Sequence, residues 1–197
     1  MSPQKLLKHL FKTSPLLAII FVTIIWITNI IQESSKLDDV SKIKASYPKV
    51  DVKLDQSFSG TAIAVDGDSI KVAGNSVRLL GIDAPEYKQT CFDAKNSEYP
   101  CGIISKNFTK NLVDGKNVTC HYHKKDIYNR YLAQCELDGV VINWQILRNG
   151  MAVIYNYSEV DVEIKMLESQ AKADKLGIWQ GSFQLPKEYR KTHKKGK

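Results

Sequence analysis

Residues 65–86 read VDGDSIKVAGNSVRLLGIDAPE, and this stretch decides the fold. Polar and apolar residues alternate from Ser57 onward and turn at Asp66-Gly67, a pair typical of tight hairpin turns. The pattern resumes after the next turn and stops at Pro85, which cannot continue a central strand. The stretch therefore predicts three consecutive strands joined by short turns.

Two further strands are predicted over residues 117–126 and 129–139, joined by a polar turn. Between the two groups of strands, Ile104, Phe108 and Leu112 recur at helical spacing, and Gly115 marks a helix end. Two more helices are predicted; they cover residues 140–150 and 159–177. This order favours an α+β fold in which three helices pack on a five-stranded barrel of the OB type.

Composition and charge place the chain among folded proteins. Hydrophobic residues make up 43% and charged residues 25% of its 197 residues, which excludes a disordered chain. The formal charge of +7 is concentrated at the ends: residues 1–12 carry +3 and residues 187–197 carry +5, so the remainder carries −1. The basic C-terminal tail, residues 187–197, is interpreted either as a solvated terminus or as a nucleic-acid contact.

The N-terminal region predicts a membrane anchor. Residues 13–32 hold no charged side chain, and the apolar run from Pro15 to Ile31 reaches the lower limit for a membrane-spanning helix. The lysines precede the run, which places residues 1–12 in the cytoplasm and the rest of the chain outside it. A cleaved signal peptide is the alternative, although no small-x-small cleavage site follows the run. Residues 33–55 are polar and are interpreted as a stalk that leads to a domain over residues 56–186.

Four acidic residues, Asp66, Asp68, Asp83 and Glu86, lie at the predicted strand ends. If these strands are neighbours, their carboxylates converge, and closely spaced carboxylate and carbonyl oxygens suit Ca²⁺. The same Asp-Gly and Asp-Ala-Pro sequences also occur as ordinary turns, so this pattern alone leaves both interpretations open.

Two arginines favour the catalytic interpretation. Arg78 lies within an apolar strand, where a charge is costly without a partner, and Arg130 follows a turn. The planar guanidinium group makes paired contacts with phosphate oxygens. Carboxylates for a cation together with two arginines form a set of residues suited to phosphoryl transfer.

Five separated blocks resemble the staphylococcal nuclease (thermonuclease) family. They occur in the family's order between about Phe58 and Tyr189, and they read VDGDSIKV, VRLLGIDAPE, DIYNRYLA, GMAVIYNY and AKADKLGIW. The resemblance implies a monomeric, calcium-dependent endonuclease that hydrolyses DNA, RNA or both with low sequence specificity and leaves 3′-phosphate ends.

The resemblance also implies a role for each matching residue. Asp68, Asp83 and the backbone carbonyl of Ala84 match the calcium ligands, and Glu86 matches the carboxylate that orients or deprotonates the attacking water. Arg78 and Arg130 match the phosphate-binding arginines, and Asp66 matches a nearby supporting acid. The aromatic residues that match the nucleotide pocket are Tyr128, Tyr155 and Tyr157; a structural role in the core is equally compatible with the last two.

Two departures from the family's pattern affect these expectations. Ile127-Tyr128-Asn129 stands where the family commonly has a basic residue followed by Tyr-Gly, which we expect to weaken binding of a terminal phosphate. Asn129 tolerates the left-handed backbone that such a turn needs. The loop after Glu86 carries Cys91 and Cys101, which the staphylococcal enzyme lacks.

The four cysteines lie after the apolar segment, and their even number suggests two disulfides outside the cytoplasm. Three pairings are possible. The local pairing, Cys91 with Cys101 and Cys120 with Cys135, is preferred because the second bridge would cross the predicted hairpin. Reduced cysteines or a zinc site with His121 and His123 are the alternatives, and strand alternation disfavours the zinc site.

The sequence thus predicts a nuclease in the periplasm or at the cell exterior, tethered to the membrane or secreted after signal cleavage. Two other functions remain open. One is a non-catalytic OB-type module that binds nucleic acid at the cell envelope, and the other is a structural envelope protein. The presence of Glu86 beside two candidate metal ligands favours the enzyme, because binding alone does not need it.

Overall fold

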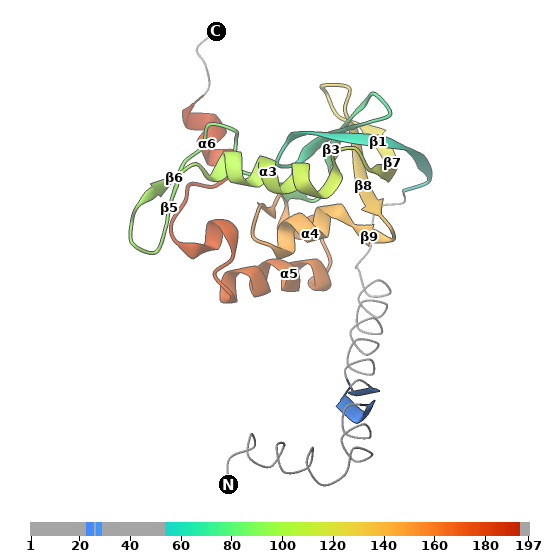
Figure 1. Ribbon diagram of the computed structural model, residues 1–197. Helices are drawn as coiled ribbons and strands as arrows, with labels where there is room; N and C mark the ends of the chain where they lie inside the picture. Colours follow the sequence, from blue (N-terminus) through green and yellow to red (C-terminus); the bar gives the residue numbers. More distant parts are fainter. Residues whose placement is uncertain (1–22, 26, 29–53, 194–197) are drawn as a thin grey trace, which may run out of the picture. The chain divides into compact units, whose positions relative to one another are not determined.

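The computed structural model describes residues 23–25, 27–28 and 54–193 (Figure 1). The chain divides into two units, Met1–Ser46 and Tyr47–Lys197. Within the first unit the described residues are helical. In the described ranges, no helix has the length and apolar character needed to cross a membrane. Most of the expected anchor and stalk, the cytoplasmic segment and residues 194–197 lie outside the described residues.

Five strands of the second unit form a closed barrel, as predicted. They are β1 (Gln56–Asp66), β2 (Ser69–Val72), β3 (Asn75–Leu79), β7 (Asn117–Lys125) and β8 (Tyr131–Leu137). The sheet order is β3-β2-β1-β7-β8, and β3 also pairs with β8, which closes the barrel. β1 is long enough to pair with two strands: its first half pairs with β7 and its second half with β2.

The closing pair, β3 with β8, is parallel, whereas the other barrel pairs are antiparallel. Its register places Val77 opposite Tyr131 and Arg78 opposite Leu132. Arg130 directly precedes β8, so this pairing brings the two predicted phosphate-binding arginines to the same end of the barrel.

Helices pack against the barrel and cover its core. The predicted helices are α3 (Cys101–Val113), α4 (Ile142–Arg148) and α5 (Val162–Ala173). A further helix, α6 (Pro186–Thr192), occupies part of the segment expected to be a basic tail. Trp144, from α4, is fully buried among the barrel side chains.

Short elements complete the unit. β9 (Val140–Val141) extends the barrel sheet beside β8, and β4 (Ile82–Asp83) pairs with β10 (Val153–Ile154). β5 (Cys91–Phe92) and β6 (Glu98–Tyr99) form a small hairpin, and Phe92 also pairs with Ser182 (Figure 1). Two 3-10 turns are present, η1 (Tyr157–Glu159) and η2 (Gly177–Gln180).

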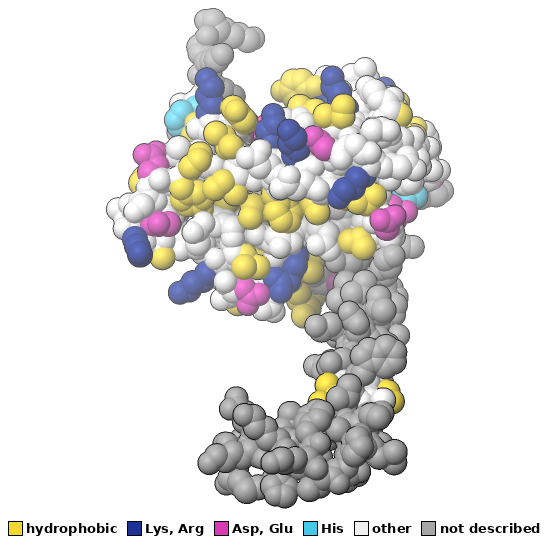
Figure 2. Space-filling view, in the orientation of Figure 1, with side chains coloured by type: hydrophobic (Ala, Val, Ile, Leu, Met, Phe, Trp, Pro, Cys, Tyr) yellow, Lys and Arg dark blue, Asp and Glu magenta, His cyan; other side chains and the backbone are white. Residues whose placement is uncertain are grey.

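The outer and inner faces of α3 differ. Hydrophobic side chains gather over the α3 region of the surface (Figure 2), and this helix carries the part-exposed Ile103 and Ile104. Its inner face instead buries the hydroxyl groups of Ser105 and Thr109, which donate to the carbonyls of Met151 and Gly67 at 2.7 Å each. The inner face of α3 therefore fixes the turn between β1 and β2.

The predicted disulfide pairing is confirmed. Cys91 is bonded to Cys101, with 5.6 Å between their Cα atoms, and Cys120 to Cys135, with 4.0 Å. Cys120 and Cys135 are cross-strand partners in β7 and β8, so the second bridge lies across the hairpin. Disulfides persist in oxidising compartments, and the two bridges indicate an extracytoplasmic environment.

Candidate functional site

A cavity of about 920 Å³ opens at the end of the barrel where β3 and β8 pair. Its size falls in the range typical of ligand sites. Most of the predicted site residues line it; these are Asp66, Asp68, Arg78, Ala84, Glu86, Tyr128, Arg130 and Tyr155. Asp83 and Tyr157 are not among the lining residues.

The turn between β1 and β2 places Asp68 at the base of the cavity. The Gly67 carbonyl is held by Thr109, and the Gly67 N–H donates to the Asp66 carboxylate at 2.9 Å. Asp68 is buried, and its Oδ2 accepts the Ala84 N–H at 2.7 Å. This last contact joins the β1–β2 turn to the end of β4.

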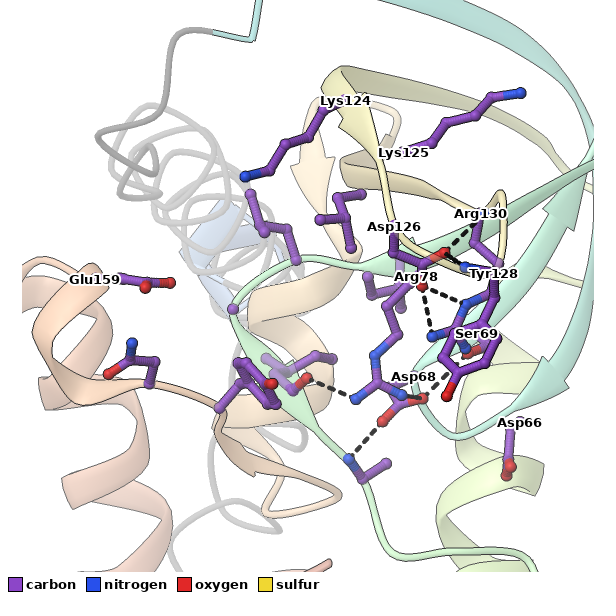
Figure 3. A pocket seen from close by; sticks show the side chains of 18 of the residues that line it. Asp66, Asp68, Ser69, Arg78, Lys124, Lys125, Asp126, Tyr128, Arg130 and Glu159 are labelled. Carbon is purple, nitrogen blue, oxygen red and sulfur yellow. Dashed lines mark hydrogen bonds and ion pairs between the residues drawn. The ribbon is translucent and has the colours of Figure 1, made fainter. Parts of the chain in front are cut away.

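Arg78 bridges two of the candidate metal ligands. Its Nη1 forms an ion pair with Asp68, and its Nη2 donates to Asp83 Oδ1 at 2.8 Å. Figure 3 shows the Arg78 guanidinium against the Asp68 carboxylate. The partner that Arg78 needs in an apolar strand is therefore this pair of acids.

The loop after β4 carries Glu86 and rests on the start of α3. The Gln89 carbonyl accepts the Gly102 N–H at 3.1 Å, and Gln89 Oε1 accepts the Glu86 N–H at 3.2 Å. A Cβ at Gly102 would lie 1.8 Å from the Glu86 carbonyl oxygen, so only glycine permits this approach. Cys101, at the first position of α3, ties the same helix end to Cys91.

We expect the two disulfides to differ in their effect on catalysis. The double change Cys91→Ser/Cys101→Ser should lower the free energy of unfolding by roughly 2–4 kcal/mol. It should also lower the cleavage rate well below the melting temperature, because this bridge supports the segment that holds Glu86. Cys120→Ser/Cys135→Ser should cost comparable stability with a smaller loss of rate. Urea unfolding and initial rates measure both effects; equal rates in the two variants would contradict the prediction.

Arg190, in α6, also reaches the acidic residues, a contact that was not predicted from the sequence. Its Nη1 lies 2.9 Å from Asp83 Oδ1 and 2.8 Å from Glu86 Oε1, and its Nη2 lies 2.9 Å from Asp83 Oδ2. Hydrogen bonds from Arg190 to Asp83, opposed by burial, raise the pKa of the guanidinium. Pro186 occupies the first turn of α6, a position that proline favours, but this signal does not indicate where Arg190 points.

The turn between β7 and β8 holds Arg130 in place. Asp126 Oδ2 accepts from Nε of Arg130 at 2.8 Å and pairs with its Nη2 at 2.7 Å (Figure 3). Burial opposes ionisation of Asp126, but the hydrogen bonds from Arg130 and from the Tyr128 N–H outweigh it and lower the carboxyl pKa. Asn129 adopts a φ of 61°, which confirms the left-handed turn expected for it.

Basic and aromatic side chains line the rest of the cavity. Ile127, which stands where the family commonly has a basic residue, is 91% exposed and lines the cavity together with Lys124 and Lys125. Tyr128 and Tyr155 are exposed lining residues. The Tyr157 hydroxyl instead accepts a hydrogen bond from Lys172, in α5, at 3.0 Å.

Burial raises the pKa values of the two acids in the β1–β2 turn. Desolvation raises the pKa of Asp68 to about 6, because it outweighs the opposing effects of the Arg78 charge and the Ala84 N–H. Desolvation also raises the pKa of Asp66. Ionised Asp68 is therefore costly to the metal-free fold, and this cost is consistent with a functional role.

We expect Asp68→Asn to stabilise the metal-free protein in a pH-dependent way. The pKa of Asp68 is higher in the folded than in the unfolded protein, so its carboxyl group contributes to the free energy of unfolding. This contribution is complete below pH 3.8 and is lost as the pH rises through about 6. Asn does not ionise, so the stability of the variant relative to wild type should rise by on the order of 2–3 kcal/mol between pH 4 and pH 7. Urea unfolding in chelator measures the difference, and a value independent of pH would contradict the prediction.

Carboxylate oxygens, the donors that a hard divalent cation prefers, gather at and beside the cavity, but they are paired with arginines. Asp83 Oδ1 and Glu86 Oε1 both contact one cationic nitrogen of Arg190, so one positive charge can bridge them. Asp68 and Asp83 are likewise joined by Arg78. Within the described part of the chain, no three His, Cys, Asp or Glu side chains form a group that could hold a metal ion as they stand. Guanidinium groups lie among the carboxylates instead.

Comparisons with known proteins find a matching family model and several relatives. Residues 76–181 match the family model of the staphylococcal nuclease homologues, which includes Arg78, Asp83, Glu86 and Arg130 but neither Asp68 nor Arg190. The chain is 35% identical over 127 residues to an uncharacterized endonuclease of Escherichia coli O157:H7, covering 62% of this chain and 76% of that protein.

Two other relatives have different names. Identity is 32% over 126 residues to the succinoglycan biosynthesis protein ExoI of Rhizobium meliloti (strain 1021), covering 61% of this chain and 63% of that protein. Identity is 34% over 131 residues to the endonuclease YncB of Bacillus subtilis (strain 168), covering 60% of each. The chain therefore spans less than two thirds of the length of these two relatives.

Proposed function

The chain belongs to the family of staphylococcal nuclease homologues, and from this membership we propose that it is a calcium-dependent endonuclease that hydrolyses phosphodiester bonds in DNA, RNA or both. The observation that carries the proposal is the convergence of Asp68, Asp83 and Glu86 on the guanidinium groups of Arg78 and Arg190. Acids and arginines thus meet beside the cavity, a combination of groups that supports phosphoryl transfer.

The metal ligands in this proposal are the carboxylates of Asp68 and Asp83 and the backbone carbonyl of Ala84. All are oxygen donors, which Ca²⁺ prefers. When bound, the ion supplies positive charge that neutralises a phosphate oxygen. Asp66, whose carboxylate accepts the Gly67 N–H, supports the turn that carries Asp68.

Glu86 is the proposed general base. About a third of its side chain is exposed to the cavity, and its backbone N–H is held by Gln89. A carboxylate in this position can hold a water molecule and accept its proton as the water attacks phosphorus. Arg78 and Arg130 then stabilise the charge that develops on the phosphate oxygens. By family resemblance the products carry a 3′-phosphate and a 5′-hydroxyl.

Substrate bases are proposed to stack on Tyr128 and Tyr155, which line the cavity, and on Tyr157, which does not line it. Aromatic rings accept any base, which supports low sequence specificity. Lys124 and Lys125 add positive charge for the nucleic-acid backbone. One protein chain supplies all of these groups, in keeping with a monomer.

The test is digestion by the full-length protein. Supercoiled plasmid DNA and a single-stranded RNA are each incubated with the protein in calcium and in chelator. Cleavage in calcium that stops in chelator supports the proposal, and end-labelling identifies the 3′-phosphate. Retention of the nucleic acid in a mobility-shift assay without cleavage would instead identify the alternative, a non-catalytic OB-type module.

We also propose that residues 13–32 direct the nuclease domain to the outside of the cytoplasm. They act either as a membrane anchor or as a signal peptide that is later cleaved. The two disulfides support an extracytoplasmic site. Protease added to intact spheroplasts should remove the domain, and protection until lysis would contradict this orientation. Mass spectrometry of the mature N-terminus separates anchor from cleaved signal.

A further inference from the structure

The contact between Arg190 and the acidic residues uses both oxygens of Asp83. One guanidinium nitrogen faces Oδ1 and the other faces Oδ2, each at 2.9 Å. Asp83 is only 2% exposed and does not line the cavity, whereas Arg190 does. Arg190 therefore covers Asp83 on the cavity side. A cation that enters from the cavity meets the guanidinium of Arg190 before it meets Asp83.

The segment that carries Arg190 is docked by specific contacts. Gln89 is fully buried; its Nε2 donates to the Gln184 carbonyl at 2.6 Å. The Tyr189 hydroxyl donates to the Lys88 carbonyl at 3.2 Å. Because Gln89 also accepts the Glu86 N–H, one side chain links the catalytic loop to the C-terminal segment. The position of Arg190 is thus set by the same loop that positions Glu86.

The charges make Arg190 and a divalent ion competitors. Arginine keeps its proton in proteins, so its guanidinium remains a cation at every working pH. Asp83 and Glu86 share its Nη1 at distances of 2.9 and 2.8 Å. A calcium ion bound as proposed needs an oxygen of Asp83 at about 2.3–2.6 Å. Both cations cannot hold Asp83 in this way at once.

We propose that Arg190 is an internal counter-cation that occupies the carboxylates of Asp83 and Glu86 until a divalent ion displaces it. The inference rests on the proposed calcium-dependent function. The new element is that α6, through Arg190, sets the calcium concentration at which the enzyme becomes active. Binding of the ion then requires release of the guanidinium, so weakening the contact of Arg190 with Asp83 and Glu86 strengthens metal binding.

The test is calcium affinity of the full-length protein in detergent, measured by isothermal titration calorimetry with calcium alone. Arg190→Gln should bind calcium at least about fivefold more tightly than wild type, the lower end of typical coupling between sites. The calcium dependence of plasmid cleavage should shift to lower concentration by the same factor. Arg190→Lys, which keeps the charge but cannot pair with both oxygens of Asp83, should fall between the two.

Lys191→Gln is the matched control. It removes the same charge from the next position of α6, where Lys191 pairs with Glu188 on the exposed surface, and it should leave calcium affinity unchanged. Thermal unfolding in chelator verifies that each variant is folded. Hydrogen exchange provides a second measurement: calcium should increase exchange of α6 amides in wild type, and this increase should shrink in Arg190→Gln.

Unchanged or weaker calcium binding by folded Arg190→Gln would overturn the inference. If that unchanged calcium affinity were accompanied by a lower cleavage rate at saturating calcium, Arg190 would be a substrate-binding residue instead. Tighter calcium binding by Arg190→Gln with no cleavage by either protein would support the inference about the cation and reject the proposed nuclease. The two proposals can therefore fail separately.

Discussion

Asp83→Asn is expected to lower the cleavage rate in calcium by at least about 10³-fold, because changes to groups that only orient metal ligands already cost about 10- to 100-fold. Asp83 lies where Arg78 and Arg190 meet, and both of its oxygens accept hydrogen bonds from guanidinium groups. Asn removes the negative charge and turns one acceptor into a donor, which opposes both arginines and a calcium ion. Calorimetry should show loss of calcium binding in parallel with loss of cleavage.

Because Asp83 is buried, its variant needs controls that separate catalysis from folding. Asp138→Asn makes the same chemical change at an exposed position in the β8–β9 turn, and it should keep full activity. Asp68→Asn should also lose cleavage while being at least as stable as wild type at pH 7 in chelator. An Asp83→Asn enzyme within tenfold of wild type would contradict the metal assignment.

Arg78→Lys is expected to lower the cleavage rate by on the order of 10²-fold or more, comparable to removal of one oxyanion donor. Lysine keeps the charge but cannot contact Asp68 and Asp83 together as the fork of Arg78 does. It also cannot make the paired contact with phosphate oxygens. Single-turnover rates at saturating calcium isolate this effect from metal binding.

Arg130→Lys should show a loss of similar size, because Asp126 holds two nitrogens of the Arg130 guanidinium in a fixed plane. Arg148→Lys is the matched control: Arg148 pairs with Asp174 on the surface, away from the cavity lining. Activity of Arg78→Lys within a few-fold of wild type would remove Arg78 from the transition-state role.

Much of the barrel could be predicted because its signals are local. Asp66-Gly67 marks the first hairpin, and Cys120 opposite Cys135 is compatible with the register of the second. The parallel pairing of β3 with β8 has no such local signal, since its partners lie more than fifty residues apart in the chain. The expectation that Arg78 and Arg130 act together therefore came from the chemistry of arginine with phosphate and from the family resemblance, not from a predicted strand pairing.

The contribution of α6 could not be predicted for a different reason. Arg190 stands among several lysines, and a basic terminal segment is usually solvated. Its role depends on tertiary contacts, mainly the buried Gln89 that binds the Gln184 carbonyl. A buried glutamine in a loop belongs to no periodic pattern, so its burial cannot be predicted from the sequence. The contact of Tyr157 with Lys172, which lies one α5 turn beyond Glu168, is likewise tertiary and has no local signal.

The parallel closure of the barrel has a consequence for the order of folding. Hairpins β1–β2 and β7–β8 join neighbours in sequence, whereas pairing of Val77 with Tyr131 must first close a long loop, and such contacts form slowly. Arg78 and Arg130 reach the same cavity only through that pairing. A newly made chain therefore acquires its complete set of charged residues only when the barrel closes, and partly folded chains lack a working site.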